Sequence, residues 1–417
     1  MAGVTPVNRI AKWDGSSWSS LGSGMNNSVN ALAVSGNDLY AGGAFTKASG
    51  TSANYVAKWD GSTWSALGSG LNRGVGALAV SGTNLFAGGS FTTAGGTTAN
   101  YIAKWNGSAW SALGSGMGSY VSALAVLGTN LFAGGSFTTA GGTTANYVAK
   151  WNGITWSSLD SGMDSEVNAL AVSGTNLYAG GYFSIASGNP ANRIAKWDGS
   201  AWSALSSGMN QGVYALAFSD TNLYAAGDFS TAGGTTAICV AKWNGNEWSA
   251  LGSGVNGGVR ALAISGTDLY VGGGFTMAGG NPASRIAKWD GNAWSSLGSG
   301  IGAGGELNLV VALMVSGSDL YAGGNFSTAG NKVSAYVAKA NIGAARGRFS
   351  NMNHSPVTGF SCTFLDGSVG QPYRIQTSQS LAAGPWTDFT NFTYTAPVVI
   401  NVPTAAATNQ FFRAITP

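Results

Sequence analysis

Hydrophobic and polar residues alternate in short runs along most of the chain, and the same four runs return in the same order. In the copy that begins at Val75 the runs read VGALAVSG, NLFAGGSF, NYIAKWNG and AWSALGSG. Gly, Ser, Thr and Asn separate the runs, and none of them has the spacing of an amphipathic helix. The pattern therefore predicts four β-strands per copy, which we call A, B, C and D.

The Lys-Trp pair of strand C marks the period of the repeat. It recurs at a constant step of 46 residues, at Lys12, Lys58, Lys104, Lys150, Lys196, Lys242 and Lys288. Lys339 follows 51 residues later without its Trp. Four strands in this length are typical of one β-propeller blade, and the small side chains of Ala-Leu-Ala-Val suit a strand A that lies in the crowded centre.

Strand A sets the predicted number of blades. It occurs seven times, near Val29, Val75, Val121, Val167, Val213, Val259 and Val310. We therefore expect an all-β fold, a seven-bladed β-propeller of 46-residue four-stranded blades. Strand C occurs eight times, so either residues 8–13 or residues 336–341 are surplus. Because only the first of these keeps its Trp hairpin, we expect the N-terminal C and D strands to complete the last blade.

The two tryptophans of each copy are five residues apart. If the hairpin turns on Gly61 and Ser62, Trp59 lies opposite Trp64, and Gly suits the first turn position, which it occupies in all seven copies. We expect these pairs to hold the blades together; platforms that stack a ligand are the alternative. The structural set is Trp13, Trp18, Trp59, Trp64, Trp105, Trp110, Trp151, Trp156, Trp197, Trp202, Trp243, Trp248, Trp289 and Trp294.

These motifs carry a family resemblance. An LYAGG strand end, a hydrophobic strand, a Trp and a hairpin to a second Trp resemble the kelch repeat, from residue 8 to about residue 342. The chain is similar to kelch-like, galactose-oxidase-type propellers of secreted bacterial proteins. The resemblance implies a β-propeller that acts outside the cell. It does not imply the copper chemistry of galactose oxidase, because the repeats contain no histidine.

The composition changes beyond residue 349. Six of the nine prolines lie there, and the segments CTFLD, YRIQTS, WTDFTNF, VVINV and FFRAI have strand character. We therefore expect a propeller over residues 1–342, a linker at 343–349 and a small C-terminal β-sandwich module over 350–417. The last part resembles the terminal modules of secreted bacterial multidomain proteins.

Charge and hydropathy exclude several partners. The 19 basic and 16 acidic residues give a net charge of +3 without a basic run, so we expect no nucleic acid as a partner. No apolar stretch reaches the roughly 18 residues that span a bilayer, so we expect no membrane insertion. The first ten residues lack the features of a signal peptide. We expect an extracellular or cell-surface protein whose signal peptide is absent from this chain.

The chain contains few side chains that could act in catalysis or bind a metal. The single histidine, His354, is expected in a Pro-bounded loop outside the propeller, so composition excludes a Ser/His/Asp triad or a multi-histidine metal site within it. Asp38, Asp268 and Asp319 fall in the A–B turn where other copies have Asn, which favours turn chemistry over calcium binding. We expect no enzyme, cofactor or metal, although a hydrolase built from loop carboxylates remains open.

The recurring lysine and the two cysteines have structural interpretations. The lysines could form an anion-binding ring, but both faces of an inner blade strand are covered, so we expect each ammonium to reach a strand end or backbone carbonyls. Cys239 stands where sister copies have Tyr or Arg. We expect a buried free thiol there instead of a disulfide to Cys362.

The D–A connection differs most between copies. It supplies a different side chain on each blade, at Arg73, Tyr120, Glu166, Tyr214, Arg260 and Glu306. We expect these residues to bind one asymmetric ligand, a glycan or a protein, on the face that carries the D–A and B–C loops. Neutral drift in surface loops is the competing interpretation. The other class of function is a structural or adhesive protein that self-associates into a filament or surface layer.

Overall fold

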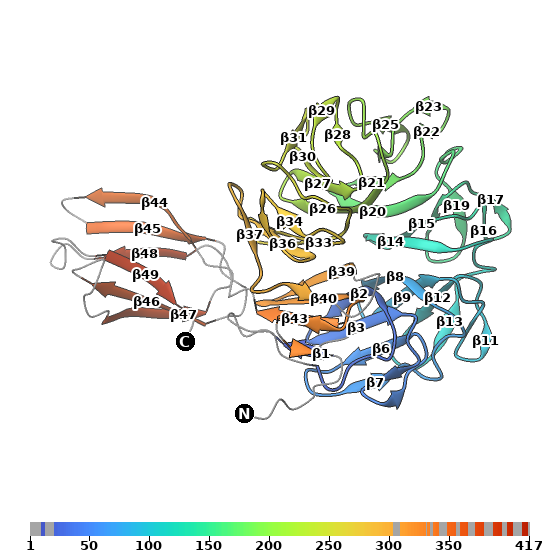
Figure 1. Ribbon diagram of the computed structural model, residues 1–417, viewed down its shortest axis with the longest axis horizontal. Helices are drawn as coiled ribbons and strands as arrows, with labels where there is room; N and C mark the ends of the chain where they lie inside the picture. The colour runs from blue at the N-terminus through green and yellow to red at the C-terminus, as the bar shows by residue number, and fades with distance from the viewer. Residues whose placement is uncertain are drawn as a thin grey trace. The chain divides into compact units, whose positions relative to one another are not determined.

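The computed structural model describes residues 10–12, 21–302 and 309–330 and the strands between residues 332 and 415, with side chains over 21–302 and 309–330. The chain divides into two compact units, Met1–Asn341 and Ile342–Pro417. All the regular elements in the described residues are β-strands (Figure 1). Within those residues there is no helix with the length and apolar character needed to cross a membrane.

Six blades make up most of the first unit, each a four-stranded antiparallel sheet in the order A-B-C-D. The A strands are β2 (Val29–Ser35), β8 (Val75–Ser81), β14 (Val121–Leu127), β20 (Val167–Ser173), β26 (Val213–Ser219) and β32 (Val259–Ser265). The B strands are β3 (Asp38–Gly43), β9 (Asn84–Gly89), β15 (Asn130–Gly135), β21 (Asn176–Gly181), β27 (Asn222–Gly227) and β33 (Asp268–Gly273). The C strands are β6 (Val56–Trp59), β12 (Ile102–Trp105), β18 (Val148–Trp151), β24 (Ile194–Trp197), β30 (Val240–Trp243) and β36 (Ile286–Trp289). The D strands are β7 (Trp64–Ala66), β13 (Trp110–Ala112), β19 (Trp156–Ser158), β25 (Trp202–Ala204), β31 (Trp248–Ala250) and β37 (Trp294–Ser296).

The A strands line the axis, since each contacts the A strand of the next blade. In Figure 1 the sheets follow one another around a centre, in chain order from blue to orange. Close packing explains the double glycine at the end of strand B. A Cβ on Gly42 would lie 2.5 Å from Val75 Cγ1 of the next blade, and one on Gly43 would overlap the Ser28 carbonyl oxygen. Glycine here allows neighbouring backbones to approach.

The hydrophobic cores lie between blades. One cluster joins Ala33 and Val56 of the first blade to Val75, Phe91 and Trp110 of the second, and similar clusters recur between the other blades. A phenylalanine just after each B strand is buried in each of these cores. The seven equivalents are Phe45, Phe91, Phe137, Phe183, Phe229, Phe275 and Phe326. Burial of such side chains between sheets is what makes each blade depend on its neighbours.

A small hairpin in each B–C loop pairs with the D–A connection. Single β-bridges such as Met25↔Ala48 and Leu71↔Ala94 join the two segments, so both lie on one face of the ring. We call this face the loop face. The hairpins are β4 (Lys47–Ala48) with β5 (Thr51–Ser52), β10 (Thr93–Ala94) with β11 (Thr97–Thr98), β16 (Thr139–Ala140) with β17 (Thr143–Thr144), β22 (Ile185–Ala186) with β23 (Asn189–Pro190), β28 (Thr231–Ala232) with β29 (Thr235–Thr236), and β34 (Met277–Ala278) with β35 (Asn281–Pro282).

The prediction of a seven-bladed propeller is wrong, because the part of the chain that the structure describes forms six blades with the four-stranded meander. The remaining strands form a mixed closing sheet of β39 (Leu309–Ser316), β40 (Asp319–Asn325), β43 (Val337–Asn341) and β1 (Ile10–Lys12). β39 contacts both β32 and β2, so this sheet lies between the last blade and the first. Beside it, β38 (Ile301–Gly302), β41 (Thr328–Ala329) and β42 (Lys332–Val333) form a three-stranded sheet.

The expected closure by the N-terminal C and D strands is also wrong. The C-terminal strand β43 takes the third position next to β40, and β1 pairs with β43 in parallel at the edge. Counting copies of strand A therefore gives too many blades, because a blade also needs its own C–D hairpin. The segment of β43 has Ala340 where the Trp of that hairpin would be. The residues that follow β1, including Trp13, lie outside the described residues.

The C-terminal unit contains the five predicted strands and one more. They are β45 (Gly359–Leu365), β46 (Pro372–Ser378), β47 (Thr387–Thr393), β48 (Val398–Val402) and β49 (Phe411–Ile415), preceded by β44 (Arg348–Ser355). The sandwich prediction is wrong: the strands form two separate three-stranded sheets, β44-β45-β48 and β47-β46-β49. Alternation predicts which residues share a face of a strand, but not which sheets pack together. His354 lies in β44 and not in a loop, and most of the expected linker lies outside the described residues.

Candidate functional site

A β-bulge near the start of each A strand gives the blades one variable position at the loop face. In the first blade Val29 pairs with Gly43 and Ala31 with Gly42, so Asn30 is left out of the ladder. The same bulge recurs in the other blades and leaves out the equivalent residue. These residues are Asn30, Gly76, Ser122, Asn168, Tyr214 and Arg260. A bulge redirects a side chain without disturbing the sheet on either side of it.

Four side chains from three consecutive blades meet at this position. The Tyr214 hydroxyl donates to Asp228 Oδ2 at 2.6 Å, and Arg260 Nη2 lies 3.2 Å from the same oxygen. The Arg260 guanidinium carbon lies 3.7 Å from the centroid of the Tyr214 ring, in a cation–π contact. The Tyr182 and Tyr214 hydroxyl oxygens are 2.5 Å apart. We call Tyr182, Tyr214, Asp228 and Arg260 the mouth network.

The proton positions in the mouth network follow from its geometry. Because Tyr214 gives its proton to Asp228, Tyr182 donates to the Tyr214 oxygen. Burial, and then the bond to Asp228, raise the pKa of Tyr214, so this phenol stays protonated at neutral pH. The result is a chain of hydrogen bonds that ends on one carboxylate oxygen.

Two glycines leave room for the mouth network. A Cβ on Gly212 would lie 2.8 Å from Tyr182 Cε1, and a Cβ on Gly258 would overlap Asp228 Oδ1. Equivalent positions in earlier blades carry Tyr120 and Glu166. Tyr182 and Asp228 thus each lie against a glycine at the entry to the next blade, although Gly74 occupies the same position next to the small Ala44.

The structure brings together part of the predicted binding set. Tyr214 and Arg260 are in contact, and Glu166 accepts a hydrogen bond of 3.0 Å from the Ser136 hydroxyl on the preceding blade. Glu166 also lies beside the network, because its carbonyl accepts from the Tyr182 amide.

The other three predicted residues lie apart from the mouth network. The Tyr120 hydroxyl lies over Gly76, where any larger side chain would collide with it, and burial raises the pKa of this phenol. Arg73 is exposed and Glu306 lies outside the described residues.

Sequence reasoning missed Tyr182 and Asp228. Both directly follow strand B, where the seven copies read GGAF, GGSF, GGSF, GGYF, AGDF, GGGF and GGNF. The residue before Phe varies as much as the D–A connection does. Comparing this position between copies would have identified both residues.

The tryptophan pairs have the predicted register. Trp59 lies opposite Trp64, with ring centroids 5.4 Å apart and the planes tilted by 49°. The second indole of each pair is buried and donates to the leucine carbonyl that precedes the D–A connection into its blade, as Trp64 does to Leu21 at 3.1 Å. The equivalent bonds run from Trp110 to Leu67, Trp156 to Leu113, Trp202 to Leu159, Trp248 to Leu205 and Trp294 to Leu251. Trp13 and Trp18 lie outside the described residues, and the structural role of the set stays a prediction.

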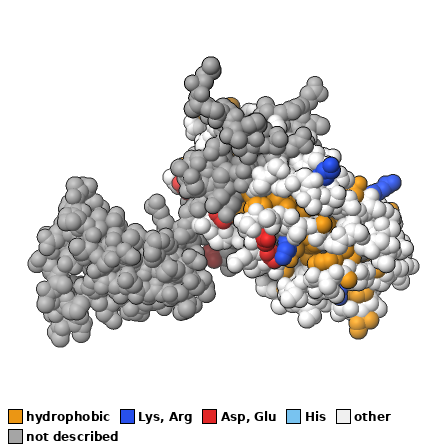
Figure 2. Space-filling model, turned by 90° about the horizontal axis from the view of Figure 1, so that it is seen from below, with side chains coloured by type: hydrophobic (Ala, Val, Ile, Leu, Met, Phe, Trp, Pro, Cys, Tyr) orange, Lys and Arg blue, Asp and Glu red, His pale blue; other side chains and the backbone are white. Residues whose placement is uncertain are grey.

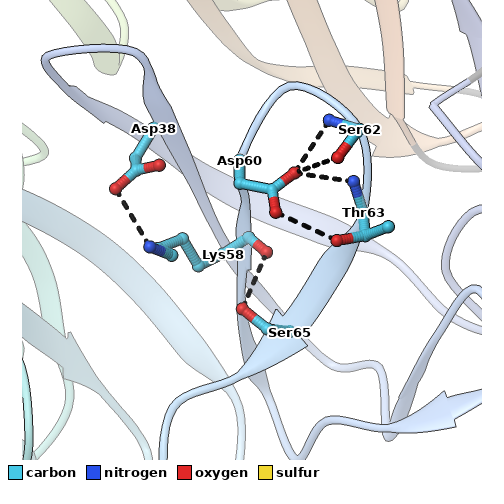
Figure 3. Close-up of polar contacts among 6 residues, drawn as sticks. All are labelled: Asp38, Lys58, Asp60, Ser62, Thr63 and Ser65. Carbon is cyan, nitrogen blue, oxygen red and sulfur yellow. Dashed lines mark hydrogen bonds and ion pairs between the residues drawn. The ribbon is translucent and has the colours of Figure 1, made fainter.

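The recurring lysine of strand C forms an ion pair with an aspartate of the A–B turn in two blades, as Figure 3 shows for Lys58. Lys58 Nζ lies 3.1 Å from Asp38 Oδ2, and Lys288 Nζ lies 3.0 Å from Asp268 Oδ2. The bond to Asp38 raises the pKa of Lys58. The turn interpretation of these aspartates therefore missed an ion pair within the blade. Such half-exposed pairs contribute little to stability.

The residue after each strand C Trp closes the hairpin, as Figure 3 shows for Asp60. Asp60 Oδ1 accepts from the Ser62 and Thr63 amides at 2.8 and 2.7 Å, and these bonds lower its pKa. Asn106 makes the same two bonds in the second blade. An oxygen acceptor is what the turn requires, which explains why Asp and Asn alternate between copies.

The charged groups do not form a metal site in the part of the chain that the structure describes. There, no three His, Cys, Asp or Glu side chains come together. Charged side chains are few and scattered on the side shown in Figure 2. Cys239 is a buried free cysteine, and burial followed by the negative charge of Asp228 raises the pKa of its thiol to about 11.

These features define a β-propeller in which side chains that differ from blade to blade lie together on the loop face. No protein-family model and no curated protein match the chain. Among solved structures it is similar to the computationally designed Ika8 protein, with 18% identity and a TM-score of 0.47 over 77% of this chain and 98% of that one. It is also similar to the WD40 β-propeller domain of Doa1, with 12% identity and a TM-score of 0.47 over 76% of this chain and 93% of that one. The WD40 domain of Neurospora crassa Pan2 is 11% identical, with a TM-score of 0.42 over 76% of this chain and 90% of that one. This degree of likeness says nothing of the site, and the kelch resemblance stays a prediction.

Proposed function

We propose that the chain is a non-enzymatic binding module that takes a glycan or a protein ligand at the mouth network of the loop face. One observation carries the proposal: three nearly identical blades place different, mutually bonded side chains at the same repeat positions. A rigid scaffold with variable loops is where binding groups usually lie. We propose further that the chain acts outside the cell or at its surface, in keeping with its low charge and abundant Ser, Thr and Asn.

A screen with two libraries tests the binding function. The folded full chain is exposed to an immobilised saccharide array and to random peptides displayed on phage. A triple variant, Tyr182→Ala with Tyr214→Ala and Arg260→Ala, is screened beside it after circular dichroism has shown that it is folded. The proposal expects at least one class of probe that binds the original chain and loses most of its affinity for the variant. Equal binding by both chains, or no binding to either library, would overturn it.

A further inference from the structure

We infer that the ligand of the mouth network is a neutral saccharide, with its ring on Tyr182 and its hydroxyls on Asp228 and Arg260. This inference rests on the proposed function and names the chemical class of its ligand. It depends on three features of the network: an exposed aromatic ring, a matched donor and acceptor, and the balance of charge.

Tyr182 is the aromatic platform. Its side chain is among the few large hydrophobic ones exposed in the described residues, at 46%. The Tyr214 ring is less accessible, because Arg260 covers one of its faces and the Tyr182 ring packs against it, with the two planes at 76°. The C–H groups of a sugar ring are weakly positive and pack on an aromatic face, which is negative. The hydrogen bond to Tyr214 holds this platform in place.

Asp228 and Arg260 form a matched acceptor and donor beside the platform. Both side-chain hydrogen bonds of Asp228 end on Oδ2, and its Oδ1 lies where Gly258 has no side chain to cover it. Arg260 has five N–H groups and uses Nη2 for the ion pair. Their side chains are 39% and 32% exposed. Neighbouring hydroxyls of a sugar each donate and accept, so one pair can bind a carboxylate oxygen and a guanidinium together.

The charge of the site favours a neutral ligand. Arg260 and Asp228 form an ion pair, so their charges cancel. An anionic ligand would have to compete with Asp228 for Arg260, and a cationic ligand would have to compete with Arg260 for Asp228. A neutral polyol can bind both groups without separating them.

A saccharide array followed by calorimetry tests the inference. The full chain is applied to an array that holds neutral, acidic and amino sugars as matched oligosaccharides. The best neutral oligosaccharide is then titrated into the original chain and into Tyr182→Ala, Asp228→Asn and Arg260→Gln. Ser90→Ala is the control, because Ser90 occupies the repeat position of Tyr182 and Asp228 in the second blade. We expect each of the three network variants to bind at least tenfold more weakly and Ser90→Ala to bind unchanged.

Gly258→Ala adds a test that removes no chemical group. Its methyl group would displace Asp228, so we expect it to weaken neutral saccharide binding as Asp228→Asn does, with an unchanged melting temperature in the absence of sugar. Binding of acidic sugars alone, or neutral binding that survives Tyr182→Ala, would overturn the inference. If displayed peptides but no saccharides bind in a way that depends on the network, the binding function stands and the saccharide inference falls.

Discussion

In five of the six described tryptophan pairs one indole is buried and the other is half-buried, although the sequence makes them look equivalent; in the first pair Trp59 is buried too. Trp110 is 8% exposed and its N–H bonds to the Leu67 carbonyl at 2.9 Å, while Trp105 stays half-buried against it. A buried indole needs a partner for its N–H, and here the partner is the connection that leads into its own blade. The second tryptophan therefore links strand D to the D–A connection and to the hydrophobic core between two blades.

Replacing the buried indole should cost far more than replacing its partner. We expect Trp110→Ala to lower the free energy of unfolding by about 3–5 kcal/mol, because it leaves a large cavity between two blades. Trp105→Ala, at a half-buried position, should cost clearly less. Urea unfolding followed by circular dichroism measures both. Trp110→Phe keeps an aromatic ring but loses the N–H bond and part of the indole volume, so it should cost more than the roughly 1 kcal/mol of the bond alone and less than Trp110→Ala. Equal losses for the two Ala variants would show that the buried bond is unimportant.

Cys239 should be nearly inert in the folded chain. Burial and the charge of Asp228 raise the pKa of its thiol to about 11, against about 8.5 for a free cysteine. The raised pKa stabilises the folded state fully below pH 8.5, and that contribution is lost as the pH rises through 11. In a Cys362→Ser background at pH 8, we expect Ellman's reagent to label the folded protein at least a hundredfold more slowly than the urea-unfolded protein. Similar rates for both would contradict the burial of this thiol.

At the scale of elements, one side chain fastens the D–A connection to the B–C hairpin in five of the six blades; the third blade has Gly118 at this position. In the second blade Asn72 Oδ1 accepts from the Thr92 and Thr93 amides at 2.9 and 3.0 Å, and its amide donates to Thr92 Oγ1 at 3.0 Å. The equivalent residues are Asn26, Asp164, Asn210 and Asn256. The D–A connection, which varies most in sequence, is therefore anchored by this residue in these blades, and its variable residues follow the anchor.

Removing this clamp should loosen one blade only. We expect Asn72→Ala to cost about 1–2 kcal/mol, since it leaves two backbone amides without their partner. Asn72→Asp should be tolerated at neutral pH, as Asp164 shows in its own blade. Burial raises the pKa of Asp164, but its bonds to Ser184 and Ile185 outweigh that effect and lower it. The Asp variant should therefore keep its stability above pH 4 and lose it as the solution becomes more acidic. Thermal melts between pH 3 and pH 8 test both variants.

The pattern of the sequence predicts elements well where one copy can be compared with another. The Trp59 and Trp64 register, the glycine turn and the shared face of the D–A and B–C loops all follow from spacing. Comparing copies would also have marked the positions of Tyr182 and Asp228 as variable, but not which side chains these two residues contact. Their contacts cross from one blade to the next, and periodicity within a blade carries no information about them.

At the scale of the whole molecule, the closing sheet is where repetition ends. Six blades each have their own meander, but β39, β40 and β43 lack a fourth strand in antiparallel order and take β1 in parallel. Val337 of β43 pairs with Ile10 of β1, and both strands carry the same Val/Ile-Ala-Lys pattern. Two segments with one pattern compete for one position, so sequence alone could not decide between them.

The ring should remain monomeric in solution, against the alternative of a self-associating filament. Large exposed hydrophobic side chains among the described residues are few: Ile154 at 80%, Tyr182 at 46%, and Ile185 and Met277 at 40% each. Ile154 lies in a C–D turn, whereas the others belong to the loop face of two different blades. Association between subunits usually needs a contiguous apolar patch, which isolated residues do not supply. Sedimentation velocity over a hundredfold range of concentration should therefore give one constant coefficient for the full chain. A coefficient that rises with concentration, and falls back in Ile154→Ser, would favour the structural alternative and place its contact at the outer edge of the third blade.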